Sequence, residues 1–99
     1  MELKNYEQFN SINDKVFIVL AKTKSCTVCN AIEPIVHDAL LDYPSIPFYK
    51  IFIENVIEFS GQQLVFTVPT LIFYKNNKEY ARLSRFILKA DLNRILSSL

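Results

Sequence analysis

The chain has 99 residues, a length typical of one domain, and 51% of them are hydrophobic, enough for a buried core without a disulfide staple or structural metal. Its 11 basic and 10 acidic residues are interspersed and leave a net charge of +1, so no basic stripe indicates nucleic-acid or membrane-surface binding. No apolar run approaches the roughly 20 residues that cross a bilayer, and the polar N-terminal stretch does not resemble a secretory signal. We therefore expect a cytoplasmic protein that forms a single domain over residues 1–99.

The first half of the chain predicts helices and strands in alternation. Apolar side chains at steps of three within residues 3–10 favour a short helix. Residues 16–21, VFIVLA, form a continuous apolar run rich in β-branched residues, which predicts a strand buried on both faces. Residues 27–43 carry apolar side chains at helical spacing, and Pro34 is expected to kink that helix. Residues 46–53, IPFYKIFI, then predict a second strand.

The second half continues the alternation and ends in a hairpin and a helix. Residues 57–64 indicate a short, weak helix, and residues 68–75, VPTLIFYK, indicate another strand. Asn76-Asn77 predicts a tight turn, after which residues 78–84 pair back as an antiparallel strand. Residues 88–99 form an amphipathic helical pattern. This order predicts an α/β fold with a central mixed sheet of about four strands, flanked by helices on both faces.

The only two cysteines, Cys26 and Cys29, lie three residues apart directly before a predicted helix. One interpretation is a zinc site. A closed structural zinc site needs four ligands, however, and the chain offers no third cysteine and only one histidine, His37, within the same predicted helix. A second interpretation is a pair of small buried hydrophobic residues, because free cysteines are often buried. A third is a redox dithiol, which the position of the pair favours.

The redox interpretation rests on the position of the pair. A cysteine at a helix N-terminus meets unpaired amide groups and the positive end of the helix dipole, and both favour thiolate over thiol. In such motifs the pKa of the first cysteine falls from about 8.5 to roughly 3.5–7.5. The second cysteine, one turn along the helix, can close a small disulfide ring with the first. In reducing surroundings such a pair is more often catalytic than structural.

Further motifs make the chain similar to the thioredoxin family over almost its full length. Pro34 follows Cys29 by five residues, and Val68-Pro69-Thr70 opens a predicted strand some forty residues later. The strand-turn-strand segment FYKNNKEY also resembles that family. The resemblance implies a thioredoxin fold and a cis Val68–Pro69 bond. It further implies that Cys26 and Cys29 are catalytic and that Val68, Pro69 and Thr70 bind the substrate.

By this resemblance the chain is expected to be a thiol-disulfide oxidoreductase. Cys26 would attack a substrate disulfide, and Cys29 would resolve the mixed disulfide. The expected partners are a disulfide-containing protein substrate and an upstream reductant, with the protein itself a monomer. We expect no cofactor and no metal, because the cysteines carry the chemistry themselves. The alternative is a protein-interaction module with little or no redox activity, since a fold does not determine its function.

The chain departs from the thioredoxin pattern around the proposed site. Ser25 replaces the usual aromatic residue before the first cysteine, and Thr27-Val28 replaces the usual Gly-Pro pair. The strand at 16–21 has no carboxylate where the family buries an acidic residue, so Lys50 is expected to lack its acidic partner. Arg85 stands where the family has a glycine near the substrate groove. Without the buried acid, we expect a slower or more specialised exchanger.

Overall fold

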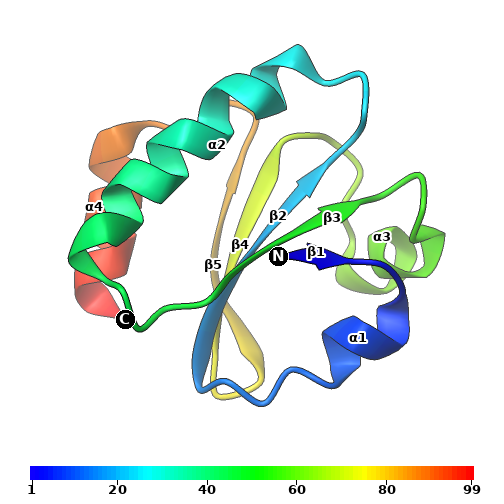
Figure 1. The fold of residues 1–99 in the computed structure, drawn as a ribbon, viewed down its shortest axis with the longest axis horizontal. Helices are drawn as coiled ribbons and strands as arrows, with labels where there is room; N and C mark the ends of the chain where they lie inside the picture. The colour runs from blue at the N-terminus through cyan, green and yellow to red at the C-terminus, as the bar shows by residue number, and fades with distance from the viewer.

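One mixed sheet forms the centre of the molecule in the computed structural model, which describes residues 1–99 (Figure 1). Its strands are β1 (Glu2–Leu3), β2 (Val16–Lys22), β3 (Phe48–Phe52), β4 (Thr70–Lys75) and β5 (Lys78–Ser84). They lie in the order β1-β3-β2-β4-β5. Strands β1, β3 and β2 run parallel to one another, and β4 is antiparallel to both of its neighbours, β2 and β5.

Helices cover both faces of this sheet. They are α1 (Tyr6–Asn10), α2 (Thr27–Ala39), α3 (Ile57–Gln63) and α4 (Lys89–Ser98), and a 3₁₀ turn, η1 (Leu40–Asp42), follows α2. Figure 1 shows α2 and α4 on one face and α1 and α3 on the other. The predicted α/β fold with a mixed sheet between helices is therefore confirmed.

The central strand β2 is apolar throughout because it is buried from both sides. Ile18 and Leu20 belong to the core beneath α2 and α4, with Leu71, Phe73 and Leu92. The β2 residues that alternate with them are Phe17, Val19 and Ala21. These belong to the core beneath α1 and α3, together with Ile51, Phe59 and Ile72. Side chains of a strand point alternately to opposite faces, so a run such as VFIVLA contributes to two cores at once.

The N-terminal segment differs from its prediction. Residues 3–10 were expected to form one helix, but Leu3 lies in β1 and pairs with Ile51 of β3. The helix begins only at Tyr6, because the side chain of Asn5 accepts a hydrogen bond from the N–H of Gln8 at 2.8 Å and caps it. The sheet consequently has five strands, one more than the number expected.

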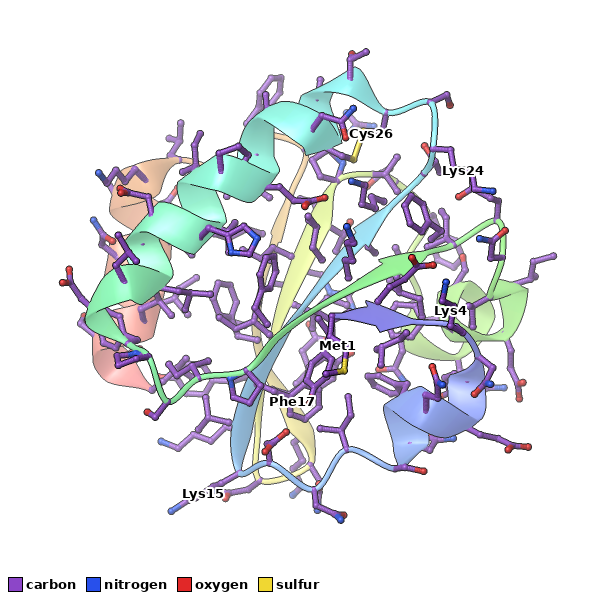
Figure 2. The ribbon with its side chains drawn as sticks, viewed as in Figure 1. Met1, Lys4, Lys15, Phe17, Lys24 and Cys26 are labelled. Carbon is purple, nitrogen blue, oxygen red and sulfur yellow. A yellow bond between two sulfur atoms is a disulfide. The ribbon has the colours of Figure 1, made fainter.

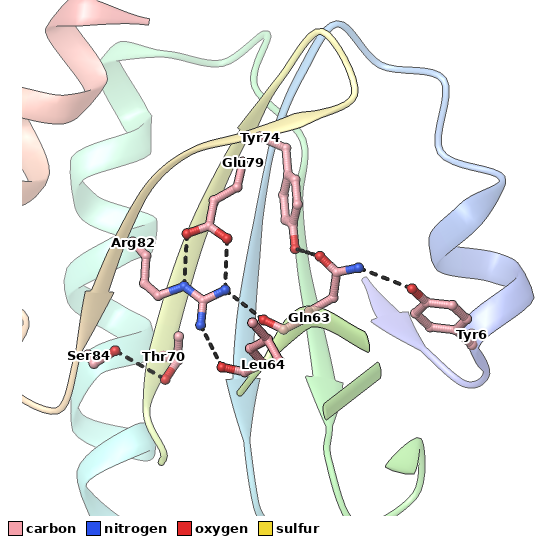
Figure 3. A network of polar contacts seen from close by, with 8 residues as sticks. All are labelled: Tyr6, Gln63, Leu64, Thr70, Tyr74, Glu79, Arg82 and Ser84. Carbon is pink, nitrogen blue, oxygen red and sulfur yellow. Dashed lines mark hydrogen bonds and ion pairs between the residues drawn. The ribbon is translucent and has the colours of Figure 1, made fainter. Parts of the chain in front are cut away.

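An arginine clamp ties β5 to the end of α3 (Figure 3). The guanidinium of Arg82 donates to the backbone carbonyls of Gln63 at 2.7 Å and Leu64 at 2.9 Å. It also binds both carboxylate oxygens of Glu79, at 2.8 and 2.9 Å. A cation at a helix C-terminus satisfies carbonyls that the helix leaves unpaired. The clamp therefore holds the start of the loop that leads from α3 to Pro69.

Candidate active site

Cys26 is the N-cap residue of α2 and forms a disulfide with Cys29. The two Cα atoms are 5.3 Å apart, and the Sγ of Cys26 accepts the N–H of Cys29 at 3.1 Å. Figure 2 shows Cys26 where the loop carrying Lys24 enters α2. The structure thus brings the two predicted catalytic residues together as a redox pair in its oxidised form.

The two sulfur-bearing residues differ in their access to solvent. Cys29 is fully buried at 0% exposure, whereas Cys26 is partly exposed. The first turn of α2 contains no acidic side chain, so nothing offsets the positive end of the helix dipole there. Once the disulfide is reduced, the open amide groups and this dipole favour a thiolate on Cys26. Cys26 is the accessible member of the pair, and Cys29 lies behind it.

A surface groove of about 390 Å³ lies beside Cys26 and joins two distant segments of the chain. Its lining residues are Ser25, Cys26, Thr27, Val28, Val68, Pro69, Arg85 and Phe86. The Val68–Pro69 peptide bond is cis, as the resemblance implied. Two of the three predicted substrate-binding residues, Val68 and Pro69, therefore lie at the groove with Cys26.

Thr70, the third predicted substrate-binding residue, does not line this groove. Its side chain is buried at 1% exposure, and its hydroxyl donates to the carbonyl oxygen of Thr67 at 2.7 Å. The same hydroxyl lies 3.4 Å from that of Ser84 in the neighbouring strand (Figure 3). Thr70 thus holds the turn that carries Pro69, and a direct contact with substrate stays a prediction.

An ion-paired cluster forms around Glu33 of α2, and it corrects the expectation that Lys50 has no acidic partner. The carboxylate of Glu33 forms an ion pair with Lys22, and its second oxygen lies 3.9 Å from the Nζ of Lys50. Lys22 also donates to the side chain of Asn30 at 3.3 Å and lies over the ring of Phe52. Only 6% of the Lys22 side chain is exposed.

The carboxylate of Glu33 stays ionised in this cluster. Burial alone raises its pKa, but the hydrogen bond and charge of Lys22 and the charge of Lys50 outweigh that effect, and the pKa lies below its ordinary value of 4.5. The sequence signal for this residue was its position four residues after Cys29, which puts both side chains on one face of α2. The strand at 16–21 has no carboxylate, whereas Glu33 supplies one from α2.

The remaining candidate ligand, His37, lies away from the cysteines. It is an exposed residue of α2 whose ring packs edge-on against Phe48, with ring centroids 5.0 Å apart. No cluster of three or more histidine, cysteine, aspartate or glutamate side chains is arranged to hold a metal ion. None of the helices combines the length and the apolar character needed to cross a membrane.

The sequence profile of the thioredoxin family matches residues 1–98. The chain belongs to the thioredoxin family. A thioredoxin-like protein of Bacillus subtilis, YdfQ, is 33% identical over 85 residues, which cover 86% of this chain and 75% of the relative. Thioredoxin-2 of Saccharomyces cerevisiae is 31% identical over 84 residues, covering 82% of this chain and 81% of the relative.

Solved thioredoxin structures share the fold. Plasmodium falciparum thioredoxin superposes with a TM-score of 0.87 at 21% identity, covering 98% of this chain and 96% of that one. Oxidised mitochondrial thioredoxin 3 of S. cerevisiae gives a TM-score of 0.88 at 16% identity, covering 100% of this chain and 94% of that one. Family membership and the Cys26–Cys29 disulfide make this thioredoxin-family protein a thiol-disulfide oxidoreductase.

Proposed function

We propose that the Cys26–Cys29 dithiol reduces disulfides of protein substrates bound in the groove beside Cys26. The observation that carries this proposal is the arrangement of the groove. The partly exposed Cys26 lies at its wall with Val68 and Pro69, while Cys29 is buried behind it. A substrate segment in this groove meets one sulfur atom and not the other, which supports attack by Cys26 and resolution by Cys29.

The reaction is a two-electron exchange in two steps. The thiolate of Cys26 attacks one sulfur of the substrate disulfide, so that bond breaks, a mixed disulfide forms, and the other substrate sulfur leaves as a thiolate that takes up a proton. Cys29 then loses its proton and attacks the Sγ of Cys26, releasing the second substrate thiol. The substrate is reduced, and the protein returns to the disulfide form. A dithiol reductant must then restore the cysteine pair.

The backbone of Val68 supports binding of an extended substrate segment. Val68 lies in the loop before β4, and neither its N–H nor its carbonyl oxygen is hydrogen-bonded within the chain. Free backbone groups of this kind can pair with a peptide that adds as a strand. Such pairing would bring a half-cystine of the substrate to Cys26, with Pro69 as the adjacent wall.

Reduction of insulin by dithiothreitol tests this proposal. The wild-type protein should accelerate insulin precipitation, and Cys26→Ser should abolish the acceleration. Cys29→Ser, reduced beforehand and freed of dithiothreitol, should instead form a lasting mixed disulfide between Cys26 and insulin, visible on a non-reducing gel. A matched control is Ser97→Ala, an exposed hydroxyl in α4 outside the groove lining, which should keep the wild-type rate. Equal rates for wild type and Cys26→Ser would contradict the proposal.

We further propose that residues 1–99 act as one domain, as a monomer, in the cytoplasm. The two cores share the strands of one sheet, which supports a single cooperative unit. A reductase must be reduced again after each turnover, and the cytoplasm maintains the thiol systems for this. Sedimentation at several concentrations tests the monomer, and thiol trapping in separated cell fractions tests the compartment.

A further inference from the structure

Arg85 is the one charged residue that lines the groove beside Cys26. It directly follows β5, and its backbone has the left-handed conformation, with φ at 64°. A residue other than glycine is uncommon in this conformation, which is found disproportionately at functional sites. The N–H of Arg85 donates to the carbonyl oxygen of Pro69 at 2.8 Å. Arg85 is therefore fixed to the same proline that forms the groove wall.

The guanidinium of Arg85 has no partner within the fold. The chain has three arginines, of which Arg82 is paired with Glu79 and Arg94 with Asp91. Arg85 makes neither an ion pair nor a side-chain hydrogen bond, and no carboxylate lines the groove. A guanidinium presents a planar fork of donors that matches a carboxylate. The groove thus offers an unused carboxylate-binding group next to the reactive sulfur.

Apolar neighbours add to the effect of this charge. Val28 and Phe86 line the same groove and are 51% and 83% exposed. A bound peptide would cover these side chains and exclude water from the guanidinium, which strengthens an ion pair formed there. The apolar walls also favour a substrate with hydrophobic residues near its acidic one. The groove therefore combines one cation with an apolar border.

We infer that Arg85 is a specificity residue that favours disulfide substrates with an acidic side chain beside the reacting half-cystine. The inference rests on the proposed function only in taking this groove as the substrate site. The substrate carboxylate pairs with Arg85 while the neighbouring sulfur reaches Cys26. The guanidinium also offsets the repulsion between that carboxylate and the Cys26 thiolate.

Two disulfide peptides that differ only in Glu or Gln next to the cystine test the inference. The reduced protein should react with the Glu peptide about fivefold faster at low salt, the range of a partly exposed ion pair. High salt should bring the ratio of the two rate constants toward one, because it screens the pair. Arg85→Asn should bring the ratio to about one already at low salt. Asparagine tolerates the left-handed backbone, so this variant removes the charge and keeps the turn.

Two further variants make the result decisive. Arg85→Gly removes the charge without backbone strain and should give the same ratio as Arg85→Asn. Arg94→Gln changes the net charge equally but lies on α4 outside the groove lining, and it should keep the wild-type ratio. The inference is overturned if both Arg85 variants keep the wild-type ratio of the two rate constants. It is also overturned if they lower the rate constants for the Glu and Gln peptides equally. A wild type that reduces both peptides at one rate overturns this inference alone, and one that reduces neither peptide nor insulin overturns the proposed function as well.

Discussion

The carboxylate of Glu33 lies one helical turn beyond Cys29 and is shared by two lysines from neighbouring strands. Lys22 ends β2 and is nearly buried, so its ammonium depends on the partners that α2 supplies. Removing one partner of a buried ion pair costs more free energy of folding than forming the pair contributes. Glu33 therefore allows Lys22 to be buried at the end of β2, and their ion pair adds little further stability.

Replacing Glu33 by Gln should lower the free energy of unfolding at neutral pH by about 1–3 kcal/mol, because Lys22 loses its counter-charge. The pKa of Glu33 is lowered in the folded protein, so its contribution is complete above the unfolded pKa near 4.5 and is lost as the pH falls through the lower folded pKa. The difference between wild type and Glu33→Gln should consequently shrink below about pH 4.5. Urea unfolding of the oxidised proteins over a pH series measures it.

Asp38→Asn is the matched control for that experiment. Its ion pair with Lys89 joins two exposed side chains, at 60% and 62% exposure, and should contribute less than about 0.5 kcal/mol. A Glu33→Gln difference that stays constant from neutral to acidic pH would show that the charge of Glu33 is not the source of the stability.

Residue types and spacing predicted the dithiol well, but they did not predict the ion-paired cluster. The three-residue spacing of Cys26 and Cys29 before a helix is a local pattern, and local patterns are visible in a sequence. Glu33, Lys22 and Lys50 come from a helix and two strands, and their distances depend on how those elements pack. Of this cluster, only the four-residue step from Cys29 to Glu33 is visible in the sequence.

At the scale of elements, the helix and strand patterns predicted the order of the elements along the chain, but they did not predict β1, the shortest strand. Strand β1 has two residues, too few to display an alternating pattern, and Leu3 fits the helical spacing that continues through α1. What makes Leu3 a strand residue is its pairing with Ile51, a contact between distant segments. By contrast, the predicted turn at Asn76-Asn77 was confirmed, with φ values of 55° and 64°.

The arginine clamp between β5 and α3 leads to a prediction at this scale. Arg82→Met should lower the free energy of unfolding by about 1–3 kcal/mol, because the carbonyls of Gln63 and Leu64 lose a charged donor. Amide hydrogen exchange in α3 should become faster, since the clamp holds that helix end. Urea unfolding and exchange monitored by NMR measure the two effects.

Arg94→Met serves as the control for the clamp. Arg94 pairs with Asp91 within α4, and 69% of its side chain is exposed, so the loss should stay below about 0.5 kcal/mol. Equal losses in the two variants, or unchanged exchange in α3, would contradict the role given to Arg82.

At the scale of the whole molecule, two cores lie on opposite faces of the same sheet. Leu92 of α4 and Phe59 of α3 are both fully buried, one in each core. The residues of β2 alternate between these cores, so neither face can lose its packing without disturbing the other. The architecture therefore couples the site-bearing helix α2 to helices on the far side of the sheet.

Leu92→Ala and Phe59→Ala should each destabilise the whole protein, by about 2–5 and 3–5 kcal/mol respectively. Each variant should unfold in a single transition, with far-UV circular dichroism and tyrosine fluorescence giving the same midpoint. A partly unfolded state in Phe59→Ala that keeps its α2 and α4 packing would contradict the coupling. Wild-type unfolding recorded by the same two probes is the reference.

The edge strand β5 and the loop at Val68 differ in how they meet other molecules in a concentrated solution. Strand β5 ends the sheet, and an open strand edge is a template on which aggregates grow. Lys78 and Glu79 are exposed on this strand, and the left-handed turn at Arg85 ends it abruptly. Charged side chains on an edge strand resist the addition of further strands. Under the proposed binding mode the molecule accepts a guest strand at Val68 and repels one along β5, which separates catalysis from self-association.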